Sequence, residues 1–405
     1  MQTFLSKAFK DTPEGHEADE ILRSCVHCGF CNATCPTYQL LGDERDGPRG
    51  RIYLIKEMLE HNTASRETQL HLDRCLTCLA CETTCPSGVQ YNRLLEIGRA
   101  VAEAGNLRPL TERLQREALA QTVPQPGRFR AVLKLASLVR PLLPGAQQKK
   151  LPAVERNTQA WPSTEHPRKV LLLQGCAQTV VAPRINLAAA RVLDRLGIQA
   201  LPAEGCCGAL GHHLSREQQT RATIRNNIDR WWPAIEAGAE ALILTASGCA
   251  PTVNDYGRLL RQDREYADKA ARVASLAQDI SVFLEQQDLE SQFEGPAGNP
   301  LVAYHSPCTL QHGLKRAGRV EALLTRLNFR LTGVQDAHLC CGSAGSYSVL
   351  QKDLSQQLLD RKLECLETEQ PELIATANIG CLMHLQSGTE LPVKHWIELL
   401  INRQE

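Results

Sequence analysis

Short apolar runs alternate with amphipathic segments from about residue 168 to the end of the chain. Between the first two runs, residues 185–196 place apolar side chains at helical spacing and stop before Gly197, and residues 320–327 are their counterpart later in the chain. The runs themselves are short, as is typical of buried strands: 171–173, 241–244, 301–303 and 373–375. Strands that alternate with helices predict α/β modules built on parallel sheets.

An internal repeat underlies this pattern. Each copy places one cysteine after an apolar run, then a Cys-Cys-Gly motif, then another cysteine after a later run. These cysteines are Cys176, Cys206, Cys207 and Cys249 in the first copy, and Cys308, Cys340, Cys341 and Cys381 in the second. Corresponding cysteines lie roughly 130 residues apart, as a duplicated module predicts. Residues that follow parallel strands fall at the carboxyl edge of the sheet, where ligands bind.

The rest of the chain divides by cysteine content. Residues 17–100 hold eight cysteines, whereas residues 101–165 hold none and are rich in Pro, Arg and Gln. Helical patterns at 109–114 and 128–134 are interrupted by prolines, and the run that follows has the character of a linker. We therefore expect a multidomain α+β protein with four parts, at residues 1–100, 101–167, 168–295 and 296–405.

Composition adds one anomaly, the cysteine count of 17 in 405 residues. Lys plus Arg and Asp plus Glu both number 45, and this balance gives no support for nucleic-acid binding. The N-terminus lacks the apolar core of a signal peptide, and no run reaches the roughly 18 apolar residues of a spanning helix. We therefore expect metal ligands in a reducing compartment rather than disulfides, with any membrane contact peripheral or through a partner.

Two blocks of four cysteines carry the strongest chemical signal. Both follow C-x2-C-x2-C-x3-C-P, the ligand run of bacterial ferredoxins, in which the fourth cysteine binds the other cluster. The pattern predicts two [4Fe–4S] clusters, one on Cys25, Cys28, Cys31 and Cys85 and the other on Cys35, Cys75, Cys78 and Cys81. Zinc is the alternative, but two crowded runs that each end in proline suit clusters better.

Other residues of this region have two interpretations each. His27 and Glu82 lie inside the cysteine loops, where they could tune a cluster potential or simply be solvated. The segment Gly47-Pro48-Arg49-Gly50-Arg51 could aim a guanidinium at the clusters or at a partner carboxylate. Equally, it could cap a helix that begins near Ile52.

The four thiols of each Cys-Cys-Gly copy suit a third iron–sulfur cluster or a zinc ion. Redox-active or purely structural thiols are the alternative. Four histidines close to these cysteines could complete or orient a site, although each alone is more typical of a surface or supporting residue: His212, His305, His312 and His384. Cys365 has no partner in the repeat, and we interpret it as a non-ligand.

In these motifs the chain resembles the iron–sulfur subunits of the heterodisulfide reductase and anaerobic glycerol-3-phosphate dehydrogenase group. Within that group it is most similar to the iron–sulfur subunits of bacterial glycolate oxidases. The resemblance covers almost the whole chain and rests on residues 23–31, 42–44, 47–54, 226–229, 231–236, 340–345 and 376–381. It implies a helical two-cluster ferredoxin-type domain followed by a duplicated α/β Cys-Cys-Gly module.

The resemblance also implies a function. FAD-containing partner subunits would oxidise glycolate, or D-lactate, and this chain would pass the electrons to a quinone-linked acceptor of the respiratory chain. The complex would lie peripherally on the cytoplasmic side of the inner membrane. The chain has no G-x-G-x-x-G after a strand and no P-loop, so we expect neither a flavin nor catalytic residues on it. The alternatives are a subunit of a glycerol-3-phosphate or lactate dehydrogenase, a heterodisulfide-type thiol reductase, and a scaffold for flavoprotein subunits.

One departure from that group concerns the repeat. In that group the complete Cys-Cys-Gly motif ends in C-x2-C, and such a module can hold a non-cubane cluster on five cysteines. Here Cys249 is followed by Ala-Pro-Thr and Cys381 by Leu-Met-His, so each copy lacks the fifth cysteine. This counts against heterodisulfide-type chemistry and leaves a conventional cluster, a zinc site and a vestigial module open.

Residues 128–140 form a separate candidate, an amphipathic basic helix. Its predicted apolar face consists of Phe129, Val132, Leu133, Ala136 and Val139. Such a helix could lie on an anionic membrane, or it could pack against this protein or a partner.

Overall fold

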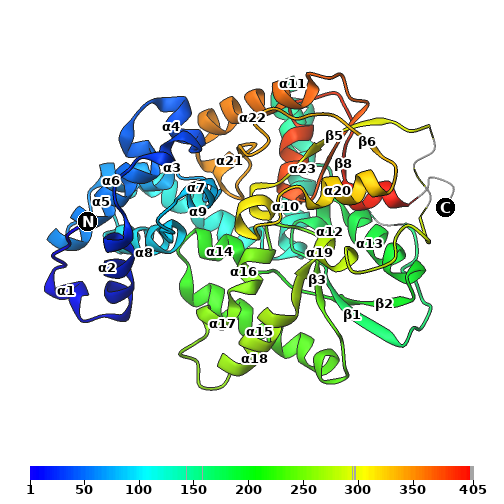
Figure 1. The fold of residues 1–405 in the computed structure, drawn as a ribbon, viewed down its shortest axis with the longest axis horizontal. Helices are drawn as coiled ribbons and strands as arrows, with labels where there is room; N and C mark the ends of the chain where they lie inside the picture. The colour runs from blue at the N-terminus through cyan, green and yellow to red at the C-terminus, as the bar shows by residue number, and fades with distance from the viewer. Residues whose placement is uncertain (143, 157, 294, 296–297, 402–405) are drawn as a thin grey trace.

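The computed structural model describes residues 1–142, 144–156, 158–293, 295 and 298–401. A helical N-terminal part lies beside two α/β modules (Figure 1). Its helices are α1 (Lys7–Lys10), α2 (Pro13–Ser24), α3 (Phe30–Ala33), α4 (Pro36–Leu41), η1 (Glu44–Asp46), α5 (Pro48–His61), α6 (Arg66–Asp73), α7 (Ala80–Thr84) and α8 (Tyr91–Ala104).

Helix α8 packs against α2, α5 and α6 at the centre of this N-terminal part. Leu22, Ile55, Leu72 and Leu94 are buried in its core. Gly98 lies where α8 meets α5, and a Cβ at this position would come within 2.7 Å of the Ile55 side chain. The tight packing fixes the ends of the helices from which the cysteine loops emerge.

The connector contains α9 (Leu110–Thr122), α10 (Pro126–Val139), the short 3-10 turn η2 (Arg140–Leu142) and α11 (Gly145–Lys150). Helix α10 begins with Pro126 in its first turn, where the missing N–H costs nothing. It packs against α9 and α12. Among the helices that the structure describes, none is both long enough and apolar enough to span a bilayer.

The first module comprises β1 (Arg168–Leu173), α12 (Gln178–Val181), α13 (Pro183–Arg195), β2 (Ile198–Ala203), α14 (Ala209–His213), α15 (Glu217–Glu236), β3 (Leu242–Leu244), α16 (Ala250–Asn254), α17 (Tyr256–Leu259), α18 (Ala267–Leu276), β4 (Ala277–Asp279) and α19 (Ile280–Leu284). Its four strands are parallel, in the order β2-β1-β3-β4. Helix α13 is the one that the spacing at 185–196 predicts.

The second module comprises β5 (Leu301–His305), a turn of π-helix η3 (Thr309–Gly313), α20 (Arg319–Arg326), β6 (Arg330–Leu331), α21 (Tyr347–Leu350), α22 (Lys352–Glu367), β7 (Leu373–Thr376), α23 (Ile379–Gln386), β8 (Val393–His395) and η4 (Trp396–Leu400). Its strands are also parallel, in the corresponding order β6-β5-β7-β8. The predicted duplicated α/β module is therefore confirmed.

In each sheet the chain changes direction of winding between the two central strands, β1 and β3 or β5 and β7. Ligand sites of open parallel sheets form at the carboxyl edge of this switch point. Cys176 and Cys249 follow β1 and β3, and Cys308 and Cys381 follow β5 and β7. The fold thus places these cysteines of each module at the edge where a ligand binds.

The two modules share one hydrophobic core, to which both sheets and α13 contribute. Beyond the carboxyl ends of β3 and β7, the Ser247 amide donates to the Ala377 carbonyl at 3.0 Å. His395 donates through Nε2 to the Thr245 carbonyl at 2.8 Å, in a buried position. These bonds bring the cysteine-bearing edges of the two sheets face to face.

Candidate iron–sulfur and cysteine-rich sites

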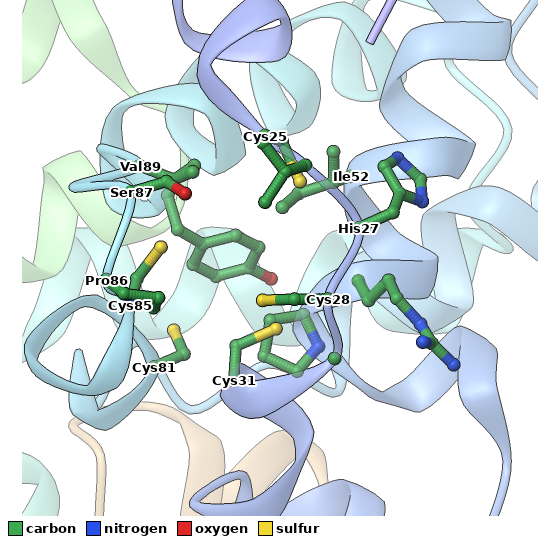
Figure 2. A pocket seen from close by; sticks show the side chains of 15 residues that line it. Cys25, His27, Cys28, Cys31, Ile52, Cys81, Cys85, Pro86, Ser87 and Val89 are labelled. Carbon is green, nitrogen blue, oxygen red and sulfur yellow. The ribbon is translucent and has the colours of Figure 1, made fainter.

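Five cysteines of the N-terminal part line one cavity (Figure 2). Cys25 ends α2, Cys28 and Cys31 lie in the loop and first turn of α3, and Cys85 ends α7. Their sulfurs point toward a common space in Figure 2. The loop turns back on itself through left-handed backbone conformations at His27 and Gly29. The fifth, Cys81, lies in α7. The other four are the predicted first ligand set, drawn from both blocks.

A second cavity is lined by four cysteines together with the side chains of Arg51 and Tyr91. The four are Cys35, Cys75, Cys78 and Cys81. Cys35 is the N-cap of α4, whose first residue is the proline of the motif. Cys81 lines both cavities, so the two are immediate neighbours. Each cavity is lined by at least four thiols, the number that a [4Fe–4S] cluster requires. The assignment of individual ligands stays a prediction.

The two cavities differ in exposure. Cys28 at the first cavity is exposed, and beside it Val26 and Phe30 are 68% and 61% exposed. At the second cavity, Cys35, Cys75 and Cys81 are buried. A group bound in the first cavity therefore lies closer to solvent than one bound in the second.

A buried ionic network supports the second cavity. The carboxylate of Asp46 accepts hydrogen bonds from His71 Nδ1 and Arg74 Nη1, both at 2.9 Å, and lies 3.5 Å from Arg51 Nη2. Arg51, only 1% exposed, donates through Nε to the His71 carbonyl at 2.7 Å. Its Nη1 lies 4.0 Å from Cys35 Sγ. The guanidinium thus brings a fixed positive charge to the thiols.

The thiols of the second cavity differ among themselves: burial raises the pKa of Cys78 and Cys81 well above its usual value, whereas Cys75 has basic neighbours. Burial raises the pKa of Cys75, but the guanidinium groups of Arg51 and Arg99 outweigh it, and this pKa lies below its usual value. The Tyr91 hydroxyl, 3.6 Å from Cys75 Sγ, adds a hydrogen bond. At the first cavity, burial and neighbouring thiols raise the pKa of Cys31 to about 11. The environment of Cys75 therefore favours negative charge more than that of Cys31.

The second module lies directly against the second cavity. Leu76 packs in one apolar cluster with Cys340 and Tyr347, and Cys78 and Cys308 border the same cluster. The Tyr347 hydroxyl donates to the Arg74 carbonyl at 3.1 Å. Thiols of the module are thus neighbours of the second cavity.

The thiols of each module form a contiguous row. In the first module, the Cys206 thiol contacts those of Cys176 and Cys207, and Cys207 contacts Cys249. In the second, the sulfurs of Cys308 and Cys340 are 3.9 Å apart, and the row continues through Cys341 to Cys381. The eight cysteines of the repeat are therefore brought together as two groups of four.

Three of the four histidines near the repeat have partners other than thiols. His212 bonds to Glu96 at 2.9 Å, and His312 bonds to Thr83 at 2.9 Å. His384 stands where the complete motif has its fifth cysteine, and its Nε2 lies 3.1 Å from Ser355 Oγ. Only the fourth, His305, joins thiols in a possible metal-binding group within the described part of the chain.

Both interpretations of the Gly-Pro-Arg-Gly-Arg segment hold in part. Helix α5 begins at Pro48, and Arg51 lies beside the second cavity, whereas Arg49 bonds to Glu44. Glu82 accepts the Asn92 amide and is not a free loop side chain. Sequence reasoning missed three further residues at the second cavity: Asp46, His71 and Tyr91. In the sequence they are only charged or polar residues between or after the cysteine blocks, and no motif identifies them.

Comparison with known proteins decides the family. Residues 21–89 match the family described as 4Fe-4S dicluster domain, and residues 170–254 and 302–386 match the cysteine-rich domain family. The chain is 54% identical over 402 residues to the glycolate oxidase iron-sulfur subunit of Escherichia coli K12, covering 99% of this chain and 98% of that protein. The chain belongs to the family of glycolate oxidase iron–sulfur subunits.

More distant relatives agree with this membership. The probable glycolate oxidase iron-sulfur subunit of Bacillus subtilis 168 is 30% identical over 400 residues, covering 91% of this chain and 89% of that protein. Lactate utilization protein A of Anoxybacillus flavithermus is 26% identical over 249 residues, 58% of this chain and 99% of its own length. A crystal structure of a hypothetical protein from Helicobacter pylori shares the fold, with a TM-score of 0.52 at 10% identity, over 97% of this chain and 72% of that one. As a member of the family, the chain is an iron–sulfur subunit of an oxidoreductase complex, and its cysteine groups fit [4Fe–4S] clusters.

Replacing Arg51 by Gln should lower the reduction potential of the cluster held at the second cavity, because the added electron loses a nearby positive charge. A unit charge about 8 Å away in an effective dielectric of about 20 contributes about 2 kcal/mol, on the order of 90 mV for one electron. Redox titration followed by EPR measures the shift. Arg51→Lys keeps the charge and should keep most of the potential. Unchanged potentials in an Arg51→Gln protein of normal iron content would contradict the assignment.

Proposed function

We propose that this chain takes electrons released by glycolate oxidation on FAD-containing partner subunits and passes them toward a quinone-linked acceptor of the respiratory chain. The observation that carries the proposal is the pair of adjacent cysteine-lined cavities, which share Cys81. The first cavity lies nearer the surface than the second, which suits the entry of electrons from a partner subunit. The names of the relatives in Escherichia coli and Bacillus subtilis supply the substrate.

When bound, [4Fe–4S] clusters supply one-electron redox chemistry, whereas a flavin handles the two electrons of a 2-hydroxy acid. The residues of this chain hold and tune the clusters. Val26 and Phe30 offer exposed apolar surface next to Cys28, where a flavoprotein subunit can dock within electron-transfer distance. Arg51 and Arg99 favour negative charge at Cys75 of the buried cavity.

The burial of the two Cys-Cys pairs argues against a thiol or disulfide reductase that uses them. Cys207 and Cys341 are buried, and a disulfide substrate has to reach a thiol in order to exchange with it. His384, which replaces the fifth cysteine of the second copy, bonds to Ser355. A scaffold without electron transfer would not need a charged network around the second cavity.

In the assembled complex, glycolate should reduce the clusters of this chain within one turnover, as observed by EPR after rapid freezing. Cys28→Ser and Cys85→Ser should impair the same cluster, although they lie in different blocks, and Cys78→Ser should impair the other. Cys365→Ser, on α22, is the matched control and should leave both signals intact. Continued quinone reduction while the clusters stay oxidised would rule out the relay. Loss of different clusters in Cys28→Ser and Cys85→Ser would rule out crossed ligation.

Helix α10 supports a second part of the proposal, contact with the cytoplasmic side of the inner membrane. Part of the predicted apolar face packs on this protein, as one of the two interpretations expects: Leu133 is buried, and Phe129 and Ala136 are half-buried. The amphipathic pattern is ambiguous because apolar residues occur on both sides of this helix. The exposed apolar side chains are Val132, Leu135, Leu138 and Val139, with Leu142 beyond the helix end.

This exposed stripe suits an interface of lipid headgroups and acyl chains. Leu138 and Leu142 are 74% and 84% exposed, which is uncommon for adjacent large apolar residues on a soluble surface. The exposed Arg128 and Lys134 on the same helix supply positive charge for anionic lipids. We therefore place this helix at the membrane surface.

The double substitution Leu135→Asp with Leu138→Asp should reduce binding of the purified complex to anionic phosphatidylglycerol vesicles by at least about tenfold, because two apolar contacts become charges. Co-flotation with the vesicles measures the bound fraction. Val349→Asp, at an exposed apolar position of α21 in the second module, is the control and should bind normally. Equal flotation of the double variant and the unchanged protein would place the membrane contact elsewhere.

A further inference from the structure

A cavity of about 470 Å³ lies between the N-terminal part and the first module. Helix α8 forms one wall, and helices α14 to α17 of the first module, which lies beside the N-terminal part in Figure 1, form the other. Pockets that enclose a small organic ligand have volumes of about 300–1,000 Å³. This cavity is therefore large enough to hold a small organic molecule.

The loop of the second cysteine block forms one end of the cavity. Thr77 and Leu79, on either side of Cys78, line both this cavity and the second cysteine cavity. The two modules close the same end, because a Cβ at Gly313 would lie 3.2 Å from Pro251 and 3.6 Å from Leu79. Only the cysteine loop thus separates a molecule at this end from the second cysteine cavity.

A guanidinium with a spare donor borders this end. Arg99 donates to the Cys75 carbonyl at 2.7 Å and to the Leu72 carbonyl at 2.9 Å. Its Nη1 donates to the Thr77 hydroxyl at 3.0 Å. Nη1 carries two N–H groups, and the described residues accept from only one of them, so the other is available to a ligand.

The imidazole of His213 supplies a second donor. Its side chain lines the cavity and is exposed, and none of the described residues hydrogen-bonds to its ring. Protein surrounds the ring on its other sides, and this burial, together with His212 and Arg99, lowers the pKa of His213 to about 4. The ring is therefore neutral at neutral pH and keeps one N–H donor.

The rest of the lining favours an uncharged occupant. Five arginines and four carboxylates border the cavity, so their charges nearly cancel. Glu96, for example, bonds to both His212 and Arg258. A site for a phosphate or a nucleotide would instead collect unpaired cations. The walls between the charged groups are apolar and include Leu79, Ala100, Val101, Pro251 and Leu259.

The other end of the cavity opens beside α9. The exposed residues Glu217 and Arg221 of α15 border it there. The Gln219 side chain joins α15 to α9 by donating to the Ala120 carbonyl at 3.0 Å. Helix α9 packs against α10, whose exposed apolar side chains suit a membrane surface. A lipid-soluble molecule can therefore reach the cavity from this side.

We propose that the cavity binds the ring of a quinone, one carbonyl oxygen of which accepts hydrogen bonds from His213 and Arg99. The proposal rests on the proposed function and makes this chain the subunit that reduces the quinone. Two electrons from the oxidised 2-hydroxy acid arrive singly through the second cysteine cavity, and two protons come from water at the open end. Both C=O groups of the quinone become C–OH groups, which gives the quinol.

Reoxidation of the reduced chain by ubiquinone-1, a short-chain quinone, tests the proposal. The full chain is reduced anaerobically with dithionite, freed of the reductant, mixed with ubiquinone-1 and frozen at intervals for EPR. The rate of cluster reoxidation should saturate with quinone concentration. His213→Leu removes a donor and should raise the half-saturating concentration at least about tenfold, as should Ala100→Phe, which fills part of the cavity. His213→Gln keeps an N–H donor and should stay within about threefold of the unchanged chain.

His61→Leu is the matched control, because this side chain is 70% exposed on α5 and does not line the cavity. All variants are compared at equal iron content. A rate that never saturates, or equal half-saturation in His213→Leu, Ala100→Phe and the unchanged chain, would overturn the proposal. Equilibrium dialysis of the unchanged chain depends on no variant; it should find about one ubiquinone-1 per chain, and finding none would also overturn the proposal.

This experiment separates the quinone site from the proposed function. Its electrons come from dithionite, so the outcome does not depend on glycolate oxidation. Clusters that glycolate cannot reduce in the complex would contradict the proposed function and leave the quinone site standing. Clusters that glycolate reduces, in a chain that binds no ubiquinone-1, would place quinone reduction on another subunit.

Discussion

The carboxylate of Asp46 binds three basic groups in the interior of the N-terminal part, and the second cavity depends on it. Asp46 has no exposed surface, and it pairs with His71, Arg74 and Arg51. Without this carboxylate, Arg51 would be a buried charge lacking its anion, which costs about 3–5 kcal/mol. The network ties the turn at η1 to the end of α6, where the second cysteine block begins. Cysteines distant in the chain therefore meet around one cavity.

The same network joins the N-terminal part to the second module. Arg74 bonds to Asp46 through its guanidinium, and its carbonyl accepts the Tyr347 hydroxyl. On the other side, Glu96 of α8 bonds to His212 and to Arg258 of the first module. The basic partners hold the pKa of Glu96 at about 2 against the opposing effect of burial, so the carboxylate stays charged at neutral pH. Both modules thus hold the ferredoxin-type part by buried or half-buried polar contacts.

Much of this architecture follows from the sequence, for identifiable physical reasons. Cysteine spacing is set by cluster geometry, and cysteines of both blocks line two neighbouring cavities; how the ligands divide between two clusters stays a prediction. The apolar runs mark β1, β3, β5 and β7, which are the central strands and are almost completely buried. The strands that the pattern missed, β2, β4, β6 and β8, are all edge strands. Edge strands carry polar positions or are very short, so no continuous apolar run identifies them.

The unpredicted features arise from contacts between residues far apart in the chain. Nothing local distinguishes Asp46 from a surface aspartate, because its burial depends on Arg74, 28 residues away. The exposed face of α10 likewise depends on which side α9 and α12 cover. The two modules show the same limit, since their cysteine rows are alike in sequence but differ at one position of the first central strand, Leu173 or His305. The two modules thus have the same strand order and corresponding cysteines, whereas the side chain at the end of the first central strand differs between them.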